Sequence, residues 1–284
     1  MRVLVNGLLP YESGKTWFVI SLANALKLKG YKIAIYKPVA GHSAWYQFNT
    51  VEYSIKYGLL IGEDVYKYRK FVGINLDFNL INPIDLLLAP PDPVKYNSVS
   101  DYIVALNDQF KQVIMFRISL YDYDLEPIHY MIKDNINNVI DGLKPYIEKL
   151  INTLKPYETD INTMIRMIFS KKCADTIVRC LKELMNDHDI VLIESFNDAA
   201  TPSISILDYI THVITVAPGR LYILDRDDFK RKTIEQYYKM GDVGIRMSNI
   251  IDRVKIRTSI CLPAFSNFHN GTRCIGSTLE NIFQ

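Results

Sequence analysis

Metal-binding and disulfide patterns are missing from this chain. It has only four cysteines in 284 residues, none of them in a C-x-x-C pair, and its five histidines lack the spacing of metal ligands. A chain of this length can stabilise its core without disulfides. We therefore expect no zinc site, and we interpret Cys173 and Cys180, which share a helical segment, as small core residues.

Long apolar runs are missing as well. The longest of them, around residues 81–91, is interrupted by proline and is shorter than the ~20 residues that a membrane helix needs. The first residues lead directly into a strand-like segment and have none of the features of a secretory signal. We therefore expect a cytoplasmic protein with no membrane partner.

The charge balance argues against a protein built around a basic surface. Lysine and arginine total 33 against 31 acidic residues, so the net charge is only +2, and the excess is spread along the chain. We expect no nucleic-acid partner, and any phosphate-binding site must be local. With 49% hydrophobic and 23% charged residues and no low-complexity tract, the chain is typical of a compact globular protein.

Strand-like and helix-like segments alternate along the chain. Residues 2–6 and 31–39 resemble strands and 15–29 a helix, which together predict a βαβ unit with two neighbouring parallel strands. Further strands are expected at 113–118, 189–194, 211–217, 244–250 and 255–262.

This alternation predicts an α/β fold with a doubly wound, mostly parallel sheet in three α/β/α layers. We expect a single domain over residues 1–284, with a helical insertion or flanking region at approximately 95–187. In a fold of this type, ligands bind at the carboxyl ends of the strands.

The strongest functional signal lies between the first strand and the first helix, where residues 7–16 read GLLPYESGKT. A phosphate-binding loop needs glycine where backbone N–H groups approach the anion, a helix N-terminus, a lysine for the terminal phosphates and a hydroxyl for Mg²⁺. Gly14, Lys15 and Thr16 supply these groups. Six residues separate Gly7 from Gly14, where the common pattern has four, so the sequence predicts a variant loop, with an incidental turn as the alternative.

A bound nucleoside triphosphate requires a divalent cation with oxygen ligands. Glu194 ends the predicted strand 189–194, and its carboxylate is expected to point into the same crevice as the loop; a solvent-facing strand end is the alternative. Asp64 is a second candidate, but Glu63 and Asp64 at a helix start could equally be capping residues. From the residues alone, both interpretations of Asp64 stay open.

Several segments together resemble the dethiobiotin synthetase-like family of P-loop ATPases, which belongs to the deviant P-loop class. ESGKT at residues 12–16 resembles that family's loop ending in E-x-G-K-T, although the segment here is one residue longer. KPV at 37–39 resembles the end of the family's second strand, and VLIE at 191–194 resembles the strand that ends in a metal-binding Glu.

The spacing of Asp64 adds to this resemblance. It lies eighteen residues before the Asn-Pro pair at 82–83, similar to the family's spacing from its metal-binding Asp to an N-P segment, and a proline-rich stretch at 89–93 follows. The similar segments together cover roughly residues 1–93 and 189–265.

The resemblance implies a set of site residues. Nucleotide binding would involve Glu12, Ser13, Gly14, Lys15, Thr16, Asn249 and Pro263; Mg²⁺ binding would involve Thr16, Asp64 and Glu194; and catalysis would involve Lys15, Lys37 and Glu194. The two lysines and Mg²⁺ would neutralise charge on the γ-phosphoryl group as it leaves. A small carboxylate or carbamate acceptor would then become an acyl phosphate.

Two departures from the family's pattern leave open which acceptor substrate and which nucleotide base the protein would bind. After Glu194 the family has a glycine-rich G-A-G-G loop near the second substrate, whereas residues 195–198 read SFND. Residues 248–252 contain N-x-x-D, where GTPases have N-K-x-D, while Asn249 resembles the family's adenine contact and Pro263 the proline after its last strand. ATP is therefore favoured over GTP.

Two classes of function remain. The protein is either an enzyme that hydrolyses ATP or activates a small substrate in the manner of a ligase, or a slow ATPase or GTPase that switches an interface with a protein partner. The predicted helical region suits either role, as a substrate lid or as a partner surface. A module that binds without hydrolysis is less consistent with the joint presence of Lys15, Thr16, Asp64 and Glu194. By analogy with relatives of the class, we also expect a homodimer.

Overall fold

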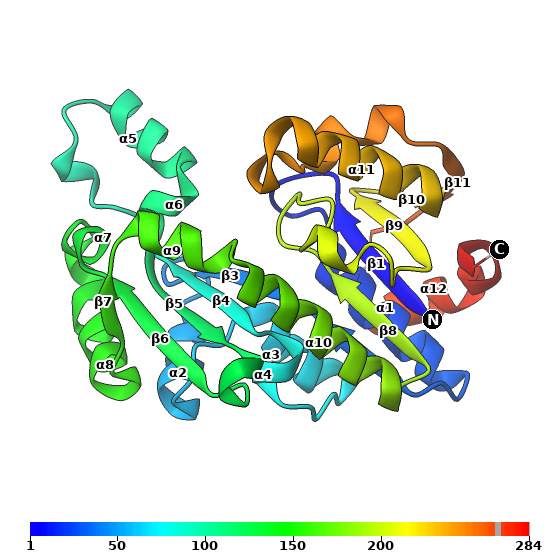
Figure 1. Ribbon diagram of the computed structural model, residues 1–284, viewed down its shortest axis with the longest axis horizontal. Helices are drawn as coiled ribbons and strands as arrows, with labels where there is room; N and C mark the ends of the chain where they lie inside the picture. Colours follow the sequence, from blue (N-terminus) through cyan, green and yellow to red (C-terminus); the bar gives the residue numbers. More distant parts are fainter. Residues whose placement is uncertain (265–267, 284) are drawn as a thin grey trace. The chain divides into compact units, whose positions relative to one another are not determined.

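The computed structural model describes residues 1–264 and 268–283 and shows an α/β protein with two mixed β-sheets (Figure 1). The chain divides into two compact units. Unit 1 comprises residues 1–38, 67–76 and the chain from 177 onward, and unit 2 comprises residues 39–66 and 77–176. The predicted α/β class is confirmed, but the strands lie in two sheets rather than in the single sheet expected.

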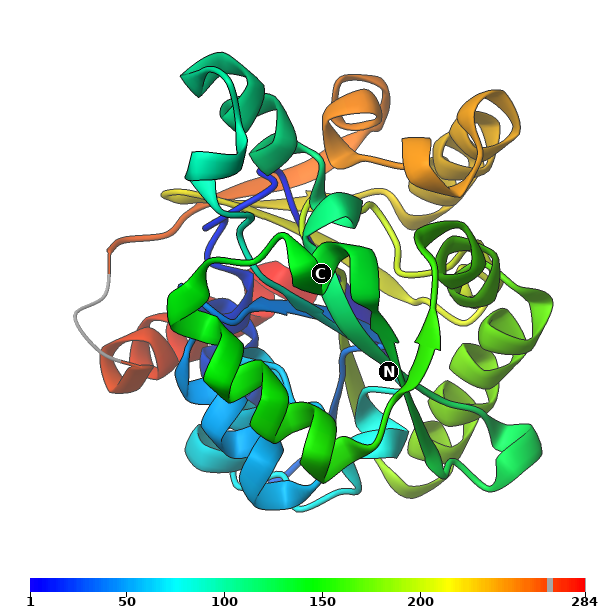
Figure 2. The same ribbon diagram turned by 90° about the vertical axis from the view of Figure 1, so that its left-hand side faces the viewer.

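Unit 1 contains a six-stranded sheet in the order β11-β10-β9-β1-β8-β2. Its strands are β1 (Arg2–Gly7), β2 (Ile33–Tyr36), β8 (Ile190–Glu194), β9 (His212–Ala217), β10 (Arg220–Leu224) and β11 (Ile256–Cys261). Its helices are α1 (Lys15–Leu28), α11 (Arg226–Met240) and α12 (Phe268–Phe283), with short 3₁₀ turns at η4 (Ile204–Ile206), η5 (Asp242–Gly244), η6 (Met247–Asn249) and η7 (Ile251–Arg253). Figure 2 shows α1 and α12 packed side by side.

Two further helices are divided between the units. They are α3 (Glu63–Val72), which belongs to unit 1 from Lys67 onward, and α10 (Lys171–Asp187), which belongs to unit 1 from Ile177 onward.

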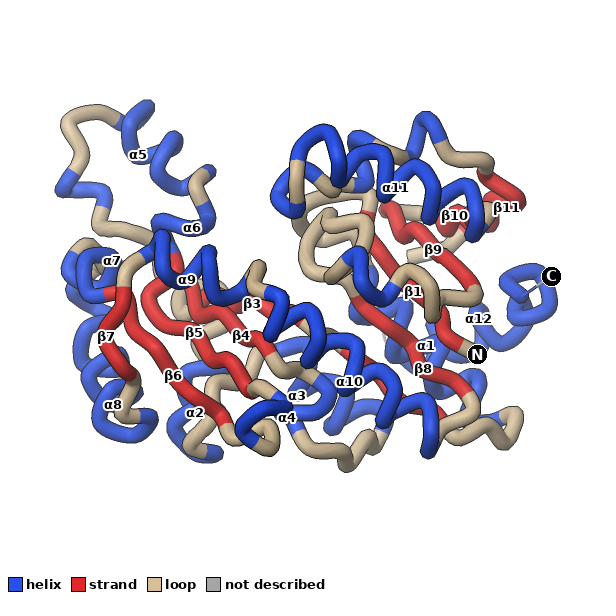
Figure 3. The backbone as a smooth tube through the Cα atoms, in the orientation of Figure 1, coloured by secondary structure: helices blue, strands red, loops and turns tan. Residues whose placement is uncertain are grey.

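The centre of the unit 1 sheet is parallel, and nearly all of its residues are buried. Strands β9, β1, β8 and β2 run in the same direction, and β10 and β11 complete the sheet in antiparallel pairs. Figure 3 shows β1 between β8 and β9. Val3, Leu4 and Val5 of β1 have no exposed surface, as expected for a strand covered on both faces. The predicted neighbours β1 and β2 are separated by β8, which pairs with both. The apolar runs in the sequence indicate which strands are buried and how long they are. They contain no information about which strand lies between two others in the sheet.

Helix α1 ends close to the predicted position. Its last helical residue is Leu28, and Gly30 adopts φ of 90°, a left-handed conformation that glycine reaches without a steric cost.

Unit 2 contains a five-stranded sheet in the order β3-β4-β5-β6-β7. Its strands are β3 (Val39–Ser43), β4 (Ile84–Leu88), β5 (Val113–Ser119), β6 (Pro127–Ile132) and β7 (Tyr157–Thr159). Its helices are α2 (Asn49–Tyr57), α4 (Phe78–Ile81), α5 (Val99–Asn107), α6 (Gln109–Gln112), α7 (Lys133–Asn137), α8 (Lys144–Leu154) and α9 (Ile161–Ile168), with 3₁₀ turns at η1 (Pro93–Lys95), η2 (Tyr121–Tyr123) and η3 (Asp141–Leu143). A cluster that includes Leu60, Leu87, Ile114 and Leu150 forms its core.

The region at approximately 95–187, predicted to be helical, contributes three strands as well as helices. The strand expected at 113–118 is present as β5, but β6 and β7 were not predicted. Strand β6 begins with proline and buries only His129 and Ile132, and β7 has only three residues, so neither strand forms a strong apolar run.

The strand predicted at 244–250 is wrong. This segment forms parts of η5 and η6 and the turn between them. Its apolar residues Ile245, Met247 and Ile250 are buried as expected, but Met247 lies in η6 and the two isoleucines lie in the connections beside the 3₁₀ turns. An apolar pattern specifies which residues are buried rather than the backbone that buries them.

No helix among the described residues is long and apolar enough to cross a membrane.

Candidate functional site

The loop between β1 and α1 closes on itself through Ser13. The Ser13 hydroxyl donates to the Leu9 carbonyl at 2.8 Å and accepts from the Leu9 N–H at 3.2 Å. The Leu8 N–H donates to the Val216 carbonyl of β9 at 3.0 Å, which fixes the start of the loop to the neighbouring strand. The loop therefore has a defined shape set by its own side chain and by the sheet.

Both glycines of this loop are required by its geometry. A Cβ atom at Gly7 would lie 2.6 Å from Ser13 Oγ and 2.7 Å from Lys15 Nζ, so the Lys15 ammonium folds back closely over the first glycine. Gly14 adopts φ of 88° and is the N-cap of α1, which places a residue without a side chain at the helix N-terminus. An anion in front of this helix end would meet backbone N–H groups without a capping side chain between them.

Lys15 is mostly buried, with 9% of its surface exposed, although it carries a charge. Its ammonium donates to the carbonyl oxygen of Asn197 at 2.6 Å. Asn197 lies in the loop after β8 and has φ of 44°, in the left-handed region that is uncommon for residues other than glycine. The loop at residues 195–198, which differs from the glycine-rich loop of the dethiobiotin synthetase-like family, is thus the one that contacts Lys15.

Glu194 is the centre of a buried polar cluster. The Thr16 hydroxyl donates to Glu194 Oε1 at 2.9 Å, and the Lys37 ammonium lies 2.7 Å from the same oxygen. Lys37 has 4% of its side chain exposed and Glu194 none. The alternative of a solvent-facing Glu194 is therefore wrong, and Lys37 is not an ordinary surface lysine.

Tyr68 completes this cluster and was not identified in the sequence. Its hydroxyl donates to Glu194 Oε2 at 2.5 Å, and its side chain has no exposed surface. Tyr68 lies on α3, one turn after Asp64, in a helix whose sequence EDVYKYRKFV contains no motif. The one available signal was helical spacing, since Tyr68 follows Asp64 by four residues and shares its side of an α-helix.

The sheet register explains why these residues meet. Val5 of β1 is opposite Glu194 of β8, and Tyr36 of β2 is opposite Ile193, so Lys37 follows its strand at the level of Glu194. The three strands are parallel and end at one edge, which brings the loop after β1, the end of β2 and the end of β8 together.

Asp64 lies in the first turn of α3, next to Glu63, in the part of the helix that belongs to unit 2. The Glu63 carboxylate accepts a hydrogen bond from the Gln47 side chain at 2.8 Å. Within residues 1–264 and 268–283, no three or more His, Cys, Asp or Glu side chains are grouped closely enough to hold a metal ion. The role of Asp64 as a metal ligand stays a prediction.

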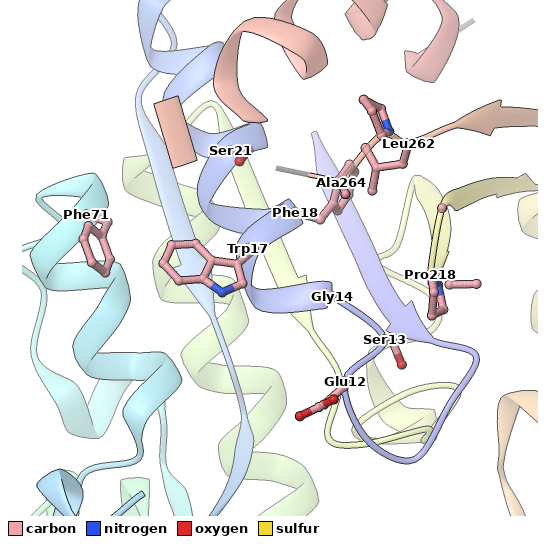
Figure 4. A pocket seen from close by; sticks show the side chains of 13 residues that line it. Glu12, Ser13, Gly14, Trp17, Phe18, Ser21, Phe71, Pro218, Leu262 and Ala264 are labelled. Atoms are coloured by element: carbon pink, nitrogen blue, oxygen red, sulfur yellow. The ribbon is translucent and has the colours of Figure 1, made fainter. Parts of the chain in front are cut away.

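A cavity of about 710 Å³ lies beside the loop in unit 1 (Figure 4). Its lining residues are Glu12, Ser13, Gly14, Trp17, Phe18, Ser21, Phe71, Ala217, Pro218, Gly219, Leu262, Pro263 and Ala264. Figure 4 shows the Trp17 ring between α1 and the Phe71 ring of α3, and the two ring centroids are 5.5 Å apart with the planes tilted by 48°. The cavity thus joins three predicted loop residues and Pro263 to an aromatic wall.

Asn249 lies on a different cavity. It lines a hollow of about 410 Å³ together with Gln236, Asp252 and Arg253, and its side-chain amide donates to the Gly244 carbonyl at 3.1 Å. The predicted site residues therefore fall into three places. Around the cavity lie Glu12, Ser13, Gly14 and Pro263. At the adjoining strand ends lie Lys15, Thr16, Lys37 and Glu194, and Asn249 lies at neither place.

Comparison of the chain with protein-family models gives no match, and comparison with curated proteins gives none either.

Proposed function

We propose that this protein binds a nucleoside triphosphate with Mg²⁺, ATP in preference to GTP, and hydrolyses it or transfers its terminal phosphoryl group. Unit 1 would then be a three-layer, doubly wound phosphate-loop domain of the dethiobiotin synthetase-like type. The observation that carries it is the meeting of Thr16, Lys37 and Glu194 beside the N-terminus of α1. These residues are far apart in the sequence, and phosphoryl transfer requires their three chemical groups together.

The donor set fits a magnesium ion. The Thr16 hydroxyl donates to Glu194, so a hydroxyl oxygen and a carboxylate lie next to each other at the start of α1. Glu194 contributes a negative charge held rigidly by its neighbours, and hydroxyl and carboxylate oxygens are the ligands that Mg²⁺ prefers. When bound, Mg²⁺ would supply positive charge that neutralises part of the charge of the phosphates.

The terminal phosphates would lie against the loop and the two lysines. Lys15 reaches back over Gly7 and donates to the carbonyl of Asn197, a neutral acceptor that a phosphate oxygen can replace. Charge-assisted hydrogen bonds to phosphate are stronger than those to a neutral carbonyl, which favours the exchange. Lys37 is held beside Glu194, and its positive charge would stabilise the negative charge of the transferring group.

In the proposed transfer, an oxygen of water, or of the carboxylate or carbamate of a small acceptor, forms a bond to the γ-phosphorus. When water is the acceptor, it releases one proton to the solvent. The bond from that phosphorus to the β–γ bridging oxygen breaks, and its electron pair stays on the departing diphosphate. Lys15 and Lys37 would stabilise the negative charge that develops during this step, which is the main contribution a protein makes to phosphoryl transfer.

The cavity next to the loop would receive the nucleoside. Its volume of about 710 Å³ lies within the range of roughly 300–1,000 Å³ typical of small-molecule sites. Trp17 and Phe71 supply flat apolar surfaces against which a base can stack, and Pro263 lies on the same cavity. A contact from Asn249 to the base stays a separate prediction, because Asn249 lines the other hollow.

A nucleotide-dependent switch is the second candidate. The observation that favours it is the hydrogen bond from Lys15 to Asn197. A phosphate that captured the Lys15 ammonium would release the loop after β8, so the shape of this loop would depend on the nucleotide. Hydrolysis stimulated by small carboxylates supports the enzyme, whereas hydrolysis stimulated only by a protein partner supports the switch.

The first experiment is calorimetric titration of the protein with ATP and with GTP, each with and without Mg²⁺, at matched salt. Trp45→Phe then leaves Trp17 as the single tryptophan, because the chain has only two, and nucleotide binding should change its fluorescence. Binding that requires Mg²⁺ and perturbs Trp17 supports the proposal. An absence of binding to either nucleotide contradicts it.

A further inference from the structure

The two oxygens of Glu194 have different partners. Oε1 accepts hydrogen bonds from Thr16 and Lys37, at 2.9 Å and 2.7 Å. Oε2 accepts from the Tyr68 hydroxyl at 2.5 Å. The oxygen next to the start of α1 is therefore Oε1, and Tyr68 occupies the other one.

Tyr68 is held rigidly enough to keep the Glu194 carboxylate in one orientation. Its ring is among the largest fully buried side chains of the protein, and its backbone is part of α3. The segment of α3 in unit 1 is also tied to α1, since the Asn24 amide donates to the Phe71 carbonyl at 3.1 Å and the Lys27 ammonium to the Val72 carbonyl at 2.6 Å. A donor placed on such a fixed element holds its carboxylate partner in one orientation.

We propose that Tyr68 is a positioning residue that restricts Glu194 to binding a cation through one oxygen, and that it thereby favours Mg²⁺ over Ca²⁺. The inference rests on the proposed function, because it concerns the same metal site. Mg²⁺ is small and requires near-octahedral geometry, so it is served well by single oxygens and water. Ca²⁺ accepts six to eight oxygens and commonly takes both oxygens of a carboxylate. Binding through Oε1 would displace the Thr16 or Lys37 donor from that oxygen. Two-oxygen binding would in addition require breaking the buried hydrogen bond from Tyr68 to Oε2.

The variant that tests this role is Tyr68→Phe, which removes the hydroxyl and keeps the ring. The matched control is Tyr36→Phe on the neighbouring strand β2. Tyr36 is also fully buried, and its hydroxyl donates to the Ile177 carbonyl at 2.9 Å. Burial raises the pKa of Tyr36 well above the usual value, so Tyr36 is a neutral donor. Both variants lose one buried tyrosine hydroxyl, but only Tyr68→Phe removes a hydrogen bond to Glu194.

The measurement is the calorimetric affinity for Mg²⁺ and for Ca²⁺ in the presence of a non-hydrolysable ATP analogue. We expect the ratio of Mg²⁺ to Ca²⁺ affinity to fall by about tenfold in Tyr68→Phe, the lower end of what loss of a residue behind a metal ligand causes, and to stay unchanged in Tyr36→Phe. An unchanged ratio in Tyr68→Phe, or an equal fall in both variants, overturns the role of Tyr68.

The wild-type protein provides a test that does not depend on the variant folding. If it binds the analogue equally well with either cation, the inference is wrong even though the proposed function stands. If it binds neither the analogue nor Mg²⁺, the proposed function fails, and the role of Tyr68 fails with it.

Discussion

The Lys37 ammonium and the Glu194 carboxylate lie 2.7 Å apart, and both side chains are buried in unit 1. A buried ion pair costs desolvation energy that its mutual attraction only partly offsets, so such a pair is weak evidence for a stabilising role. Proteins often keep buried charged groups at functional sites despite this cost. The location of this pair at the ends of two strands beside the α1 N-terminus is consistent with such a role.

Removal of one member of the pair should destabilise the protein more than removal of both charges. Lys37→Met leaves the Glu194 charge buried without its cation, and we expect a loss of about 3–5 kcal/mol in the free energy of unfolding. The double variant Lys37→Met, Glu194→Gln should recover part of this loss, because no uncompensated charge stays buried. Urea denaturation of the four proteins in the cycle measures the coupling, and additive effects would contradict a direct interaction.

Lys15→Ala should abolish triphosphate binding and leave the fold intact. Lys15 projects over Gly7 at the start of α1, where it would contact the terminal phosphates. Lys29→Ala is the matched control, because Lys29 is an exposed lysine at the opposite end of the same helix. Titration with ATP and Mg²⁺ compares the two variants, and an unchanged affinity in Lys15→Ala would disprove the phosphate-loop assignment.

Glu194→Gln should weaken Mg²⁺-dependent hydrolysis more than Mg²⁺-free nucleotide binding. The amide keeps an oxygen that can accept from Thr16 or Tyr68, but it loses the negative charge that would balance the cation. Hydrolysis rates and nucleotide affinities, each measured over a range of Mg²⁺ concentrations, separate the two effects. Equal losses in both would remove Glu194 from the metal site.

Gly7→Ala should impair the loop although it adds only a methyl group. The new Cβ would lie 2.6 Å from Ser13 Oγ and 2.7 Å from Lys15 Nζ, so Lys15 must move. We expect a destabilisation of about 1–3 kcal/mol together with weaker nucleotide binding. Gly142→Ala is the control, because no atom lies within 4 Å of the Cβ it would add. If both variants bind nucleotide like the wild type, the close approach of Lys15 to Gly7 has no part in binding.

The stability of the protein should fall on mild acidification because of His129. Burial and the nearby Arg117 lower the pKa of His129 from 6.5 to about 4, and its Nε2 accepts a hydrogen bond from the Leu60 N–H at 3.2 Å. Between these two values the unfolded chain binds a proton that the folded protein does not, so stability is complete above about pH 6.5 and decreases toward pH 4. The full effect is roughly 3 kcal/mol.

His129→Gln should make the free energy of unfolding less dependent on pH across this interval. Burial also lowers the pKa of His42 in the same unit, so some pH dependence should persist in the variant. His188→Gln, at the end of α10, is the control. Denaturation at several pH values tests the prediction, and an unaltered pH profile in His129→Gln would contradict it.

Local features of unit 1 were predictable because they depend on short stretches of sequence. The strand of β1, the glycine after α1 and the position of Lys15 at a helix start follow from apolar runs and from the backbone requirements of glycine. The same reasoning predicted that Glu194 ends a buried strand. It predicted the wrong backbone for residues 244–250, where buried apolar residues alternate without forming a strand.

The sequence by itself determined the α/β class, the loop between β1 and α1, and the candidate status of Lys15, Thr16, Lys37 and Glu194. Only the tertiary structure decided that the strands divide between two sheets, that β8 separates β1 from β2, and that Asn249 lies away from the cavity at the loop. It also brought Tyr68 to Glu194 across 126 residues of chain. The physical reason is that a local pattern specifies which residues must be buried, whereas the pairing of strands and the packing of helices decide which buried residues meet.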